Sequence, residues 1–149
     1  MDCALINLQK SKLASSELNL RGYDISLVTE PYAPKGIIRS IWSPNTNLFY
    51  KLGLDNPQTC IRVKKCLQAW SIPQFTGRDL TTVCLKIGDL NVWFAVAYLD
   101  ITLDPWQPEL VELAKHCLVN DIPLVVGMDS NAHNMLWGST ETYYQGEGH

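Results

Sequence analysis

The 149-residue sequence lacks any apolar run approaching the length of about 18 residues that a membrane-spanning helix needs. Its beginning, MDCALINLQK, carries an acidic residue where a signal peptide has basic ones, and its apolar stretch is too short for the hydrophobic part of such a signal. The five cysteines include no C-x-x-C pair, which argues against zinc and thioredoxin-type chemistry. These absences predict an intracellular protein with reduced thiols and no membrane partner.

Several catalytic signatures are absent as well. Neither the P-loop pattern G-x-x-x-x-G-K-[ST] nor the nucleophile elbow G-x-S-x-G occurs. The stretch DSNAHNMLWGST has the length of an EF-hand calcium loop, but Asn134 stands in place of its glycine and Thr140 in place of its final glutamate. These absences argue against P-loop nucleotide hydrolysis, serine-hydrolase chemistry and an EF-hand.

The pattern of apolar residues predicts one layered domain. Apolar runs alternate with helical patterns at both ends of the chain, and a strand-rich meander fills the middle, which indicates a mixed-sheet α/β or α+β fold. The expected strands are residues 3–8, 24–31, 59–70, 80–87, 91–101 and 123–128; the expected helices are residues 11–22 and 106–123; and residues 34–55 are expected to form a long loop with a brief strand or helix near 37–42. Leu13, Leu18 and Leu20 stand near helical spacing in the first helix, and Val111, Leu113 and Ala114 are expected to form the inner face of the second.

Oxygen-bearing side chains stand at the ends of three apolar runs. Asn7 ends the first run, Glu30 ends the second, and Asp129 and Asn131 end the last. Ligands of layered α/β folds collect beyond the carboxyl ends of strands, so we expect these residues to converge in one cleft. Carboxylate and amide oxygens suit Mg²⁺ or Mn²⁺, which favours chemistry on a phosphate-bearing substrate.

Basic residues are concentrated in the middle of the chain. Residues 35–86 contain eight basic and two acidic side chains, although the net charge of the whole chain is −3. Such a region predicts contacts to nucleic-acid phosphates beside the cleft, and ordinary solvated charge on strand faces is the alternative. The candidate nucleic-acid-binding residues are Lys64, Lys65, Arg62 and Arg39.

Four motifs, in this order, carry a resemblance to a known family: INLQKSK, ISLVTEPY, VAYLDI and VVGMDSNAHNMLWGS. Together they resemble the exonuclease-endonuclease-phosphatase superfamily, and in particular the apurinic-endonuclease-like endonuclease domain of non-LTR retrotransposons. The resemblance runs from Asn7 to about Gly138. It implies a four-layer sandwich, with two mixed β-sheets face to face and helices outside.

The same resemblance implies an activity and its setting. The expected function is a Mg²⁺-dependent phosphodiesterase that nicks target DNA and leaves a 3′-hydroxyl to prime reverse transcription. DNA is the implied substrate, a reverse transcriptase domain of the parent polyprotein is an implied partner, and the nucleus is the implied location.

Residue roles follow from the matched motifs. Glu30 matches the metal-binding glutamate, and Asn7 matches the asparagine that supports the metal and the phosphate. Asp129 matches the aspartate that orients or deprotonates the attacking water, and Asn131 matches the amide that holds the phosphate. Tyr98 stands where the superfamily often has a tyrosine near the phosphate, although an aromatic side chain packed at a strand end is equally compatible with the sequence.

The resemblance also shows a departure. Domains of the superfamily continue to a C-terminal Ser-Asp-His motif, whose histidine is the principal acid-base or phosphate-contacting group, but this sequence ends with STETYYQGEGH. We expect His133 to shape its loop or contact DNA rather than act as the base, and neither His116 nor His149 is expected to replace the missing histidine. Residues 1–149 are therefore expected to form one incomplete domain, about its N-terminal two-thirds. The alternative function is a catalytically incomplete fragment that binds nucleic acid or a protein partner.

Overall fold

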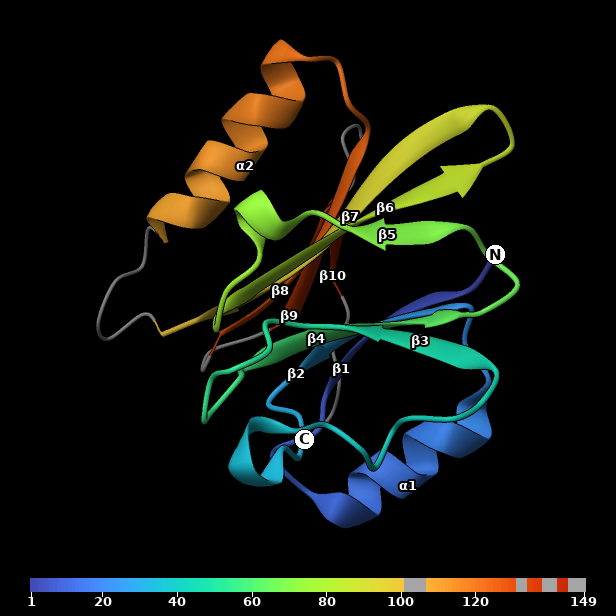
Figure 1. Ribbon diagram of the computed structural model, residues 1–149. Coiled ribbons are helices and arrows are strands. Elements are labelled where there is room, and N and C mark those ends of the chain that lie inside the picture. Colours follow the sequence, from blue (N-terminus) through green and yellow to red (C-terminus); the bar gives the residue numbers. More distant parts are fainter. Residues whose placement is uncertain (101–106, 131–133, 138–141, 145–149) are drawn as a thin grey trace.

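Two β-sheets pack face to face, and a helix covers the outer side of each, in the computed structural model of the chain (Figure 1). The structure describes residues 1–100, 107–130, 134–137 and 142–144. Both sheets are mixed, because each contains one parallel strand pair beside antiparallel pairs. This arrangement confirms the four-layer α+β sandwich expected from the sequence.

The first sheet has four strands in the order β1, β2, β4, β3. Strands β1 and β2 are parallel, and the pairs β2–β4 and β3–β4 are antiparallel. The carboxyl ends of β1 and β2 therefore share one edge with the beginning of β4. The bounds are β1 Cys3–Asn7, β2 Ile25–Thr29, β3 Thr46–Phe49 and β4 Thr59–Lys64.

The second sheet has six strands in the order β10, β9, β8, β7, β6, β5. Strands β7 and β8 are parallel, and the other neighbouring pairs are antiparallel. The carboxyl ends of β7 and β8 consequently lie at one edge of this sheet. The bounds are β5 Ala69–Ser71, β6 Leu80–Ile87, β7 Leu90–Leu99, β8 Leu124–Ser130, β9 Asn134–Trp137 and β10 Thr142–Tyr144.

The main core fills the space between the sheets. Each fully buried Val, Leu, Ile or Phe stabilises the fold by roughly 1.5–3 kcal/mol relative to an exposed side chain, so this layer fixes how the two sheets dock. Its buried residues are Leu5, Ile25, Leu27, Ile61, Val63, Val83, Leu85, Phe94 and Val96.

The first helix, α1 (Lys12–Arg21), covers the outer side of the four-stranded sheet (Figure 1). Ser11 caps its N-terminus by accepting the backbone N–H of Ala14, and Gly22 ends it in the left-handed conformation that glycine adopts readily. Leu18 is buried, but Leu13 and Leu20 are exposed. The three leucines do not share one face of the helix, because Leu13 and Leu20 each lie two residues from a buried position, about 200° around the helix.

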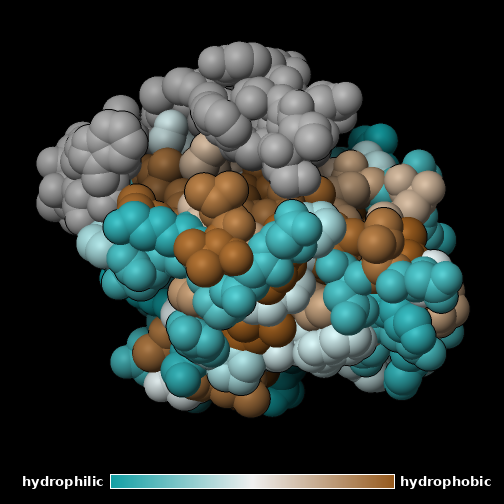
Figure 2. Space-filling view, turned by 90° about the horizontal axis from the view of Figure 1, so that it is seen from above, coloured by the Kyte–Doolittle hydropathy of each residue, from teal (hydrophilic) through white to brown (hydrophobic). Residues whose placement is uncertain are grey.

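The second helix, α2 (Pro108–Val119), packs on the six-stranded sheet through Leu113 and Cys117, which are one turn apart. Leu113 was expected in the core, but Val111 and Ala114 were assigned to the inner face wrongly and are exposed. Figure 2 looks onto this side of the molecule, where hydrophobic and hydrophilic side chains are interspersed. Neither helix of the described part of the chain is long and apolar enough to cross a membrane.

The middle of the chain differs most from the expectation. Residues 59–70 were expected to form one strand, but they form β4 of one sheet and β5 of the other, separated by a turn in which Leu67 N–H donates to the carbonyl of Lys64. The expected loop 34–55 contains β3 and the short 3-10 helix Pro34–Gly36, whereas residues 37–42 form neither strand nor helix. The second 3-10 helix, Pro73–Phe75, precedes β6.

Candidate active site

Asp129 lies at the edge where the strand ends of both sheets meet. It belongs to β8, and its side chain is almost fully buried, with an exposed fraction of 2%. The amide nitrogen of Asn7 donates a hydrogen bond of 2.6 Å to its Oδ2 atom, and the hydroxyl of Thr29 donates another of 2.6 Å to the same oxygen. Both donors belong to the four-stranded sheet, so the carboxylate joins the two sheets at this edge.

Gly127 permits this approach of the sheets. A Cβ atom at this position would lie 2.9 Å from Leu27 Cδ1 and 3.0 Å from Leu5 Cδ1, closer than side-chain carbons pack. The absence of a side chain therefore lets β8 approach β1 and β2 closely. Asp129, which is two residues further and points to the same face of the strand, can then reach the polar ends of those strands.

Asn7 is fixed by both ends of its amide group. Its nitrogen donates to Asp129, and its Oδ1 atom accepts the backbone N–H of Gln9 over 2.8 Å. The hydrogen-bond network thus assigns the amide orientation. A carbonyl oxygen has two lone pairs, so Oδ1 keeps one for a further ligand.

Glu30 follows β2 directly and is partly buried. Its backbone has φ of +49°, a left-handed conformation that is uncommon outside glycine. Two backbone hydrogen bonds hold it: its N–H donates to the carbonyl of Gln58 over 2.9 Å, and its carbonyl accepts the N–H of Lys10 over 2.8 Å. Within the described residues, the Glu30 carboxylate forms no ion pair.

Tyr98 lies beside Asp129 on the neighbouring parallel strand. Burial raises the pKa of its phenol, and the carboxylates of Glu30, Asp129, Asp100 and Asp79 raise it further, because a phenolate would be repelled by these charges. The phenol therefore stays protonated and able to donate a hydrogen bond at neutral pH.

The structure brings Asn7, Glu30, Asp129 and Tyr98 to one edge. Thr29 was not predicted as a site residue, although it lies within the motif ISLVTEPY. The available signal was its position: a hydroxyl at the end of a fully buried strand needs a partner. Asn131 and His133 lie outside the described residues.

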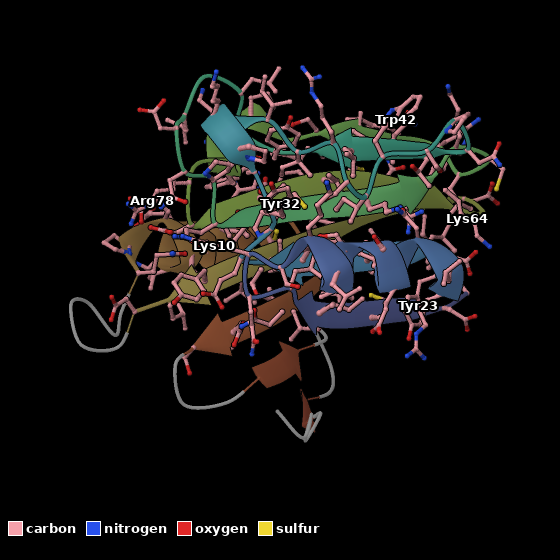
Figure 3. All side chains as sticks on the ribbon, turned by 90° about the horizontal axis from the view of Figure 1, so that it is seen from below. Lys10, Tyr23, Tyr32, Trp42, Lys64 and Arg78 are labelled. Atoms are coloured by element: carbon pink, nitrogen blue, oxygen red, sulfur yellow. The ribbon has the colours of Figure 1, made fainter. Side chains whose placement is uncertain are left out.

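The expected basic contacts are not at this edge. Strand β4 begins beside the ends of β1 and β2 and runs away from them, so Lys64 and Lys65 lie at its far end, about 17 Å away for five residues of strand. Figure 3 shows Lys64 at one end of the molecule and Lys10 and Arg78 toward the other. Lys64 there forms an ion pair with Asp24 over 3.2 Å.

Arg62 and Arg39 do not form the expected basic border either. Arg62 is buried, with an exposed fraction of 6%, and its Nη1 atom donates to the carbonyl of Leu18 over 3.4 Å. Arg39 is exposed, but the neighbouring carbonyl of Ser40 accepts a hydrogen bond from Asn19, near the end of α1 that points away from the site. Placing these residues beside the cleft was wrong because a count of charges along the sequence does not specify strand direction.

No group of three or more histidine, cysteine, aspartate or glutamate side chains that could hold a metal ion is present within the described ranges. The oxygen atoms at the site edge that could contact a cation are the Glu30 carboxylate and the Asn7 amide oxygen, which come from the ends of adjacent strands.

Neither a family model nor a curated protein sequence matches the chain. Solved structures do. The endonuclease domain of TRAS1, a telomere-specific non-LTR retrotransposon, superposes with a TM-score of 0.64 and 24% identity over 86% of this chain and 57% of that domain. An endonuclease/exonuclease/phosphatase family protein from Bacteroides thetaiotaomicron superposes with a TM-score of 0.56 and 12% identity, over 87% of this chain and 62% of that one.

D. rerio TDP2, in complex with a single-stranded DNA product, superposes with a TM-score of 0.53 and 12% identity over 87% of this chain and 60% of that one. The chain thus spans less than two thirds of the length of each of these structures. Because the matches cover 86–87% of this chain, the resemblance expected from the sequence is confirmed in the fold. The chain has the fold of the exonuclease-endonuclease-phosphatase superfamily.

Proposed function

We propose that the chain is the nuclease region of a divalent-metal-dependent DNA endonuclease that cleaves phosphodiester bonds. The observation that carries this proposal is the buried Asp129 carboxylate, held by Asn7 and Thr29 beside Glu30 and Tyr98. The fold shared with the TRAS1 endonuclease domain and with TDP2 bound to a DNA product supports DNA as the substrate.

The oxygen atoms at this edge fit a hard divalent cation, Mg²⁺ or Mn²⁺. Mg²⁺ in proteins usually has one or two carboxylate ligands and completes its shell with water and substrate phosphate. Glu30 and the Asn7 amide oxygen would hold the ion. A bound ion would supply Lewis-acid stabilisation of the phosphoryl oxygen.

The residues of the chain have distinct roles in this proposal. Asp129 orients the attacking water and accepts its proton, while Asn7 and Thr29 fix the carboxylate in one position. Tyr98, whose pKa is raised by burial and by the neighbouring carboxylates, donates a hydrogen bond to a phosphate oxygen. The roles expected of Asn131, which would hold the phosphate, and of His133, which would shape its loop or contact DNA, stay predictions.

The resemblance to retrotransposon endonucleases extends the proposal. The expected product is a nick with a 3′-hydroxyl that primes reverse transcription, with a reverse transcriptase domain of the same polyprotein as the partner and the nucleus as the location. Mapping the nick on an end-labelled duplex, followed by primer extension from it, tests the 3′-hydroxyl directly.

A plasmid-nicking assay tests the activity. The chain, alone and within any longer translated product, is incubated with supercoiled DNA in Mg²⁺, in Mn²⁺ and in EDTA, and Asp129→Asn is compared with Asp89→Asn. Asp89 is an exposed carboxylate in the turn between β6 and β7, so its substitution makes the same chemical change away from the site. We expect metal-dependent nicking that Asp129→Asn abolishes and Asp89→Asn preserves.

The alternative, a catalytically incomplete fragment that binds nucleic acid or a protein partner, gives a different result in the same assay. It predicts DNA binding or protein association without metal-dependent nicking in any translated product. Nicking that survives Asp129→Asn would contradict the proposed site itself.

A further inference from the structure

A row of residues linked by backbone hydrogen bonds crosses the site edge from one sheet to the other. Lys10 N–H donates to the carbonyl of Glu30 over 2.8 Å, Glu30 N–H donates to Gln58 over 2.9 Å, and Gln58 N–H donates to Arg78 over 2.9 Å. We call Lys10, Glu30, Gln58 and Arg78 the strand-end rim. Lys10 and Arg78, at its two ends, are cationic and exposed, and Glu30, next to Lys10, carries a carboxylate of the candidate site.

The turn that carries Lys10 is held in an unusual backbone conformation. Gln9 and Lys10 have φ of +51° and +56°, although neither is glycine. Left-handed backbone at such residues costs of order 1–3 kcal/mol each and persists where the surroundings impose it. Here Asn7 Oδ1 holds the N–H of Gln9, and the carbonyl of Leu8 accepts the N–H of Ser11 over 2.8 Å. The hydrogen bonds of the site thus also fix the position of Lys10.

Lys10 has a neutral side chain as its hydrogen-bond partner. Its ammonium donates to the Oδ1 atom of Asn56 over 3.2 Å, and this neutral partner uses one of its three donors. The N-terminus of α1 follows directly, contains no acidic residue in its first turn, and adds the partial positive charge of the helix dipole. This end of the rim is therefore preorganised for an anion.

Arg78 forms the other cationic end. Its Nε and Nη2 atoms contact the carboxylate of Asp79 at 3.2–3.3 Å, and its side chain is 56% exposed. A guanidinium has five N–H donors, so this pair orients Arg78 and leaves donors for a second anion.

The spacing of the rim fits a nucleic-acid backbone. Three strand-to-strand steps of about 4.8 Å place Lys10 and Arg78 about 14 Å apart, with Glu30 between them. That span corresponds to about four nucleotides of a DNA strand at 3.4 Å each. Figure 3 shows both cations toward the same end of the molecule.

We infer that Lys10 and Arg78 bind backbone phosphates of the DNA strand on the two sides of the bond to be cleaved, a role for the strand-end rim that rests on the proposed function. These contacts hold the strand across Glu30 without reading its sequence, because phosphate contacts position and base contacts specify. Lys64 and Lys65, at the far end of β4, take no part.

Salt-dependent binding of a short fluorescent DNA duplex in EDTA tests this inference apart from cleavage. The slope of log affinity against log salt changes by about 0.9 for each phosphate of the duplex that the protein no longer neutralises. The double variant Lys10→Gln/Arg78→Gln is compared with Lys65→Gln/Lys86→Gln, which removes the same charge from exposed positions at the opposite strand ends. Thermal unfolding of each variant establishes that it is folded.

We expect the rim variant to flatten the slope of log affinity against log salt by about 1.8, two phosphates at about 0.9 each, over roughly 50–200 mM salt. The control variant should leave the slope unchanged. The charge-conserving variant Lys10→Arg/Arg78→Lys should also keep the wild-type slope. An equal slope for the rim variant and the wild type, or equal flattening by the control, overturns the inference even when metal-dependent nicking is intact. Absence of salt-dependent DNA binding by the wild type would overturn the inference together with the proposed DNA substrate.

Discussion

Replacing Thr29 with valine should reduce the rate of catalysis as well as the stability of the fold. Valine has nearly the same shape as threonine but lacks the hydroxyl that donates to Asp129 over 2.6 Å. A hydrogen bond to a charged group contributes about 1.5–3 kcal/mol. In the variant, Asn7 still donates to the Oδ2 atom, but without the hydroxyl the carboxylate can move away from the position that orients the water.

The kinetic effect can be estimated from positioning. A displacement of about 1 Å in a catalytic group can cost about 10²-fold in rate. We therefore expect Thr29→Val to lower the metal-dependent nicking rate by roughly 10- to 100-fold. Thr29→Ser, which keeps the hydroxyl, should recover most of the rate.

Thr81→Val is the matched control. Thr81 is also fully buried, but its hydroxyl contacts the hydroxyl of Thr59 at 2.9 Å rather than a carboxylate. A neutral hydrogen bond contributes about 0.5–1.5 kcal/mol, so this variant should lose stability without a specific loss of rate. Urea unfolding and nicking rates are measured for all variants. Equal rates for Thr29→Val and Thr81→Val would refute the positioning role of Thr29.

Two further predictions concern neighbouring residues. Gly127→Ala should overpack the contact with Leu27 and Leu5, destabilise the fold by about 1–3 kcal/mol in urea unfolding and lower the nicking rate. Gly77→Ala is the control and should change neither stability nor nicking, because its Cβ atom would meet no atom within 4 Å. Equal stability of the two variants would contradict the close approach of the sheets. The raised pKa of Tyr98 keeps its phenol protonated to above about pH 10, so Tyr98→Phe should lower the nicking rate by a similar factor at pH 7 and pH 9. The difference between the ultraviolet titrations of the wild type and the variant should show one phenol that ionises above about pH 10. Ionisation of that phenol below pH 10 would contradict the electrostatic argument.

Much of the candidate site could be predicted from the sequence. Asn7 and Glu30 end buried runs, and Asp129 ends another, so convergence at carboxyl strand ends needed only the rule for parallel strands, which β1–β2 and β7–β8 satisfy. The same motifs, taken in order, also predicted the four-layer fold.

The position of the basic residues could not be predicted in this way. Whether Lys64 lies beside the site or far from it depends on the direction of β4, which is antiparallel to β2. The sequence pattern of residues 59–70 is that of one continuous strand. The turn after Lys64, through which the chain passes from one sheet to the other, depends on tertiary contacts. Lys10 and Arg78, the two cations that do lie at this edge, are far apart in the sequence, because three of the four strands of the first sheet lie between them.

Thr29 was missed for a related reason. A threonine within an apolar strand has a high intrinsic preference for that structure, so local patterns explain it without a partner. Its partner, Asp129, is 100 residues away in the sequence and belongs to the other sheet. Contacts of this kind become visible only once the packing of the two sheets is known.

The hydrogen bonds from Asn7 and Thr29 to Asp129 make the active geometry a property of the interface between the sheets and of neither sheet alone. A chain that has formed its strands but has not yet docked its sheets has all the site residues and no site. The short contacts at Asp129 therefore make the proposed activity depend on the docking of the two sheets, so that partly folded chains with intact strands should not cleave DNA.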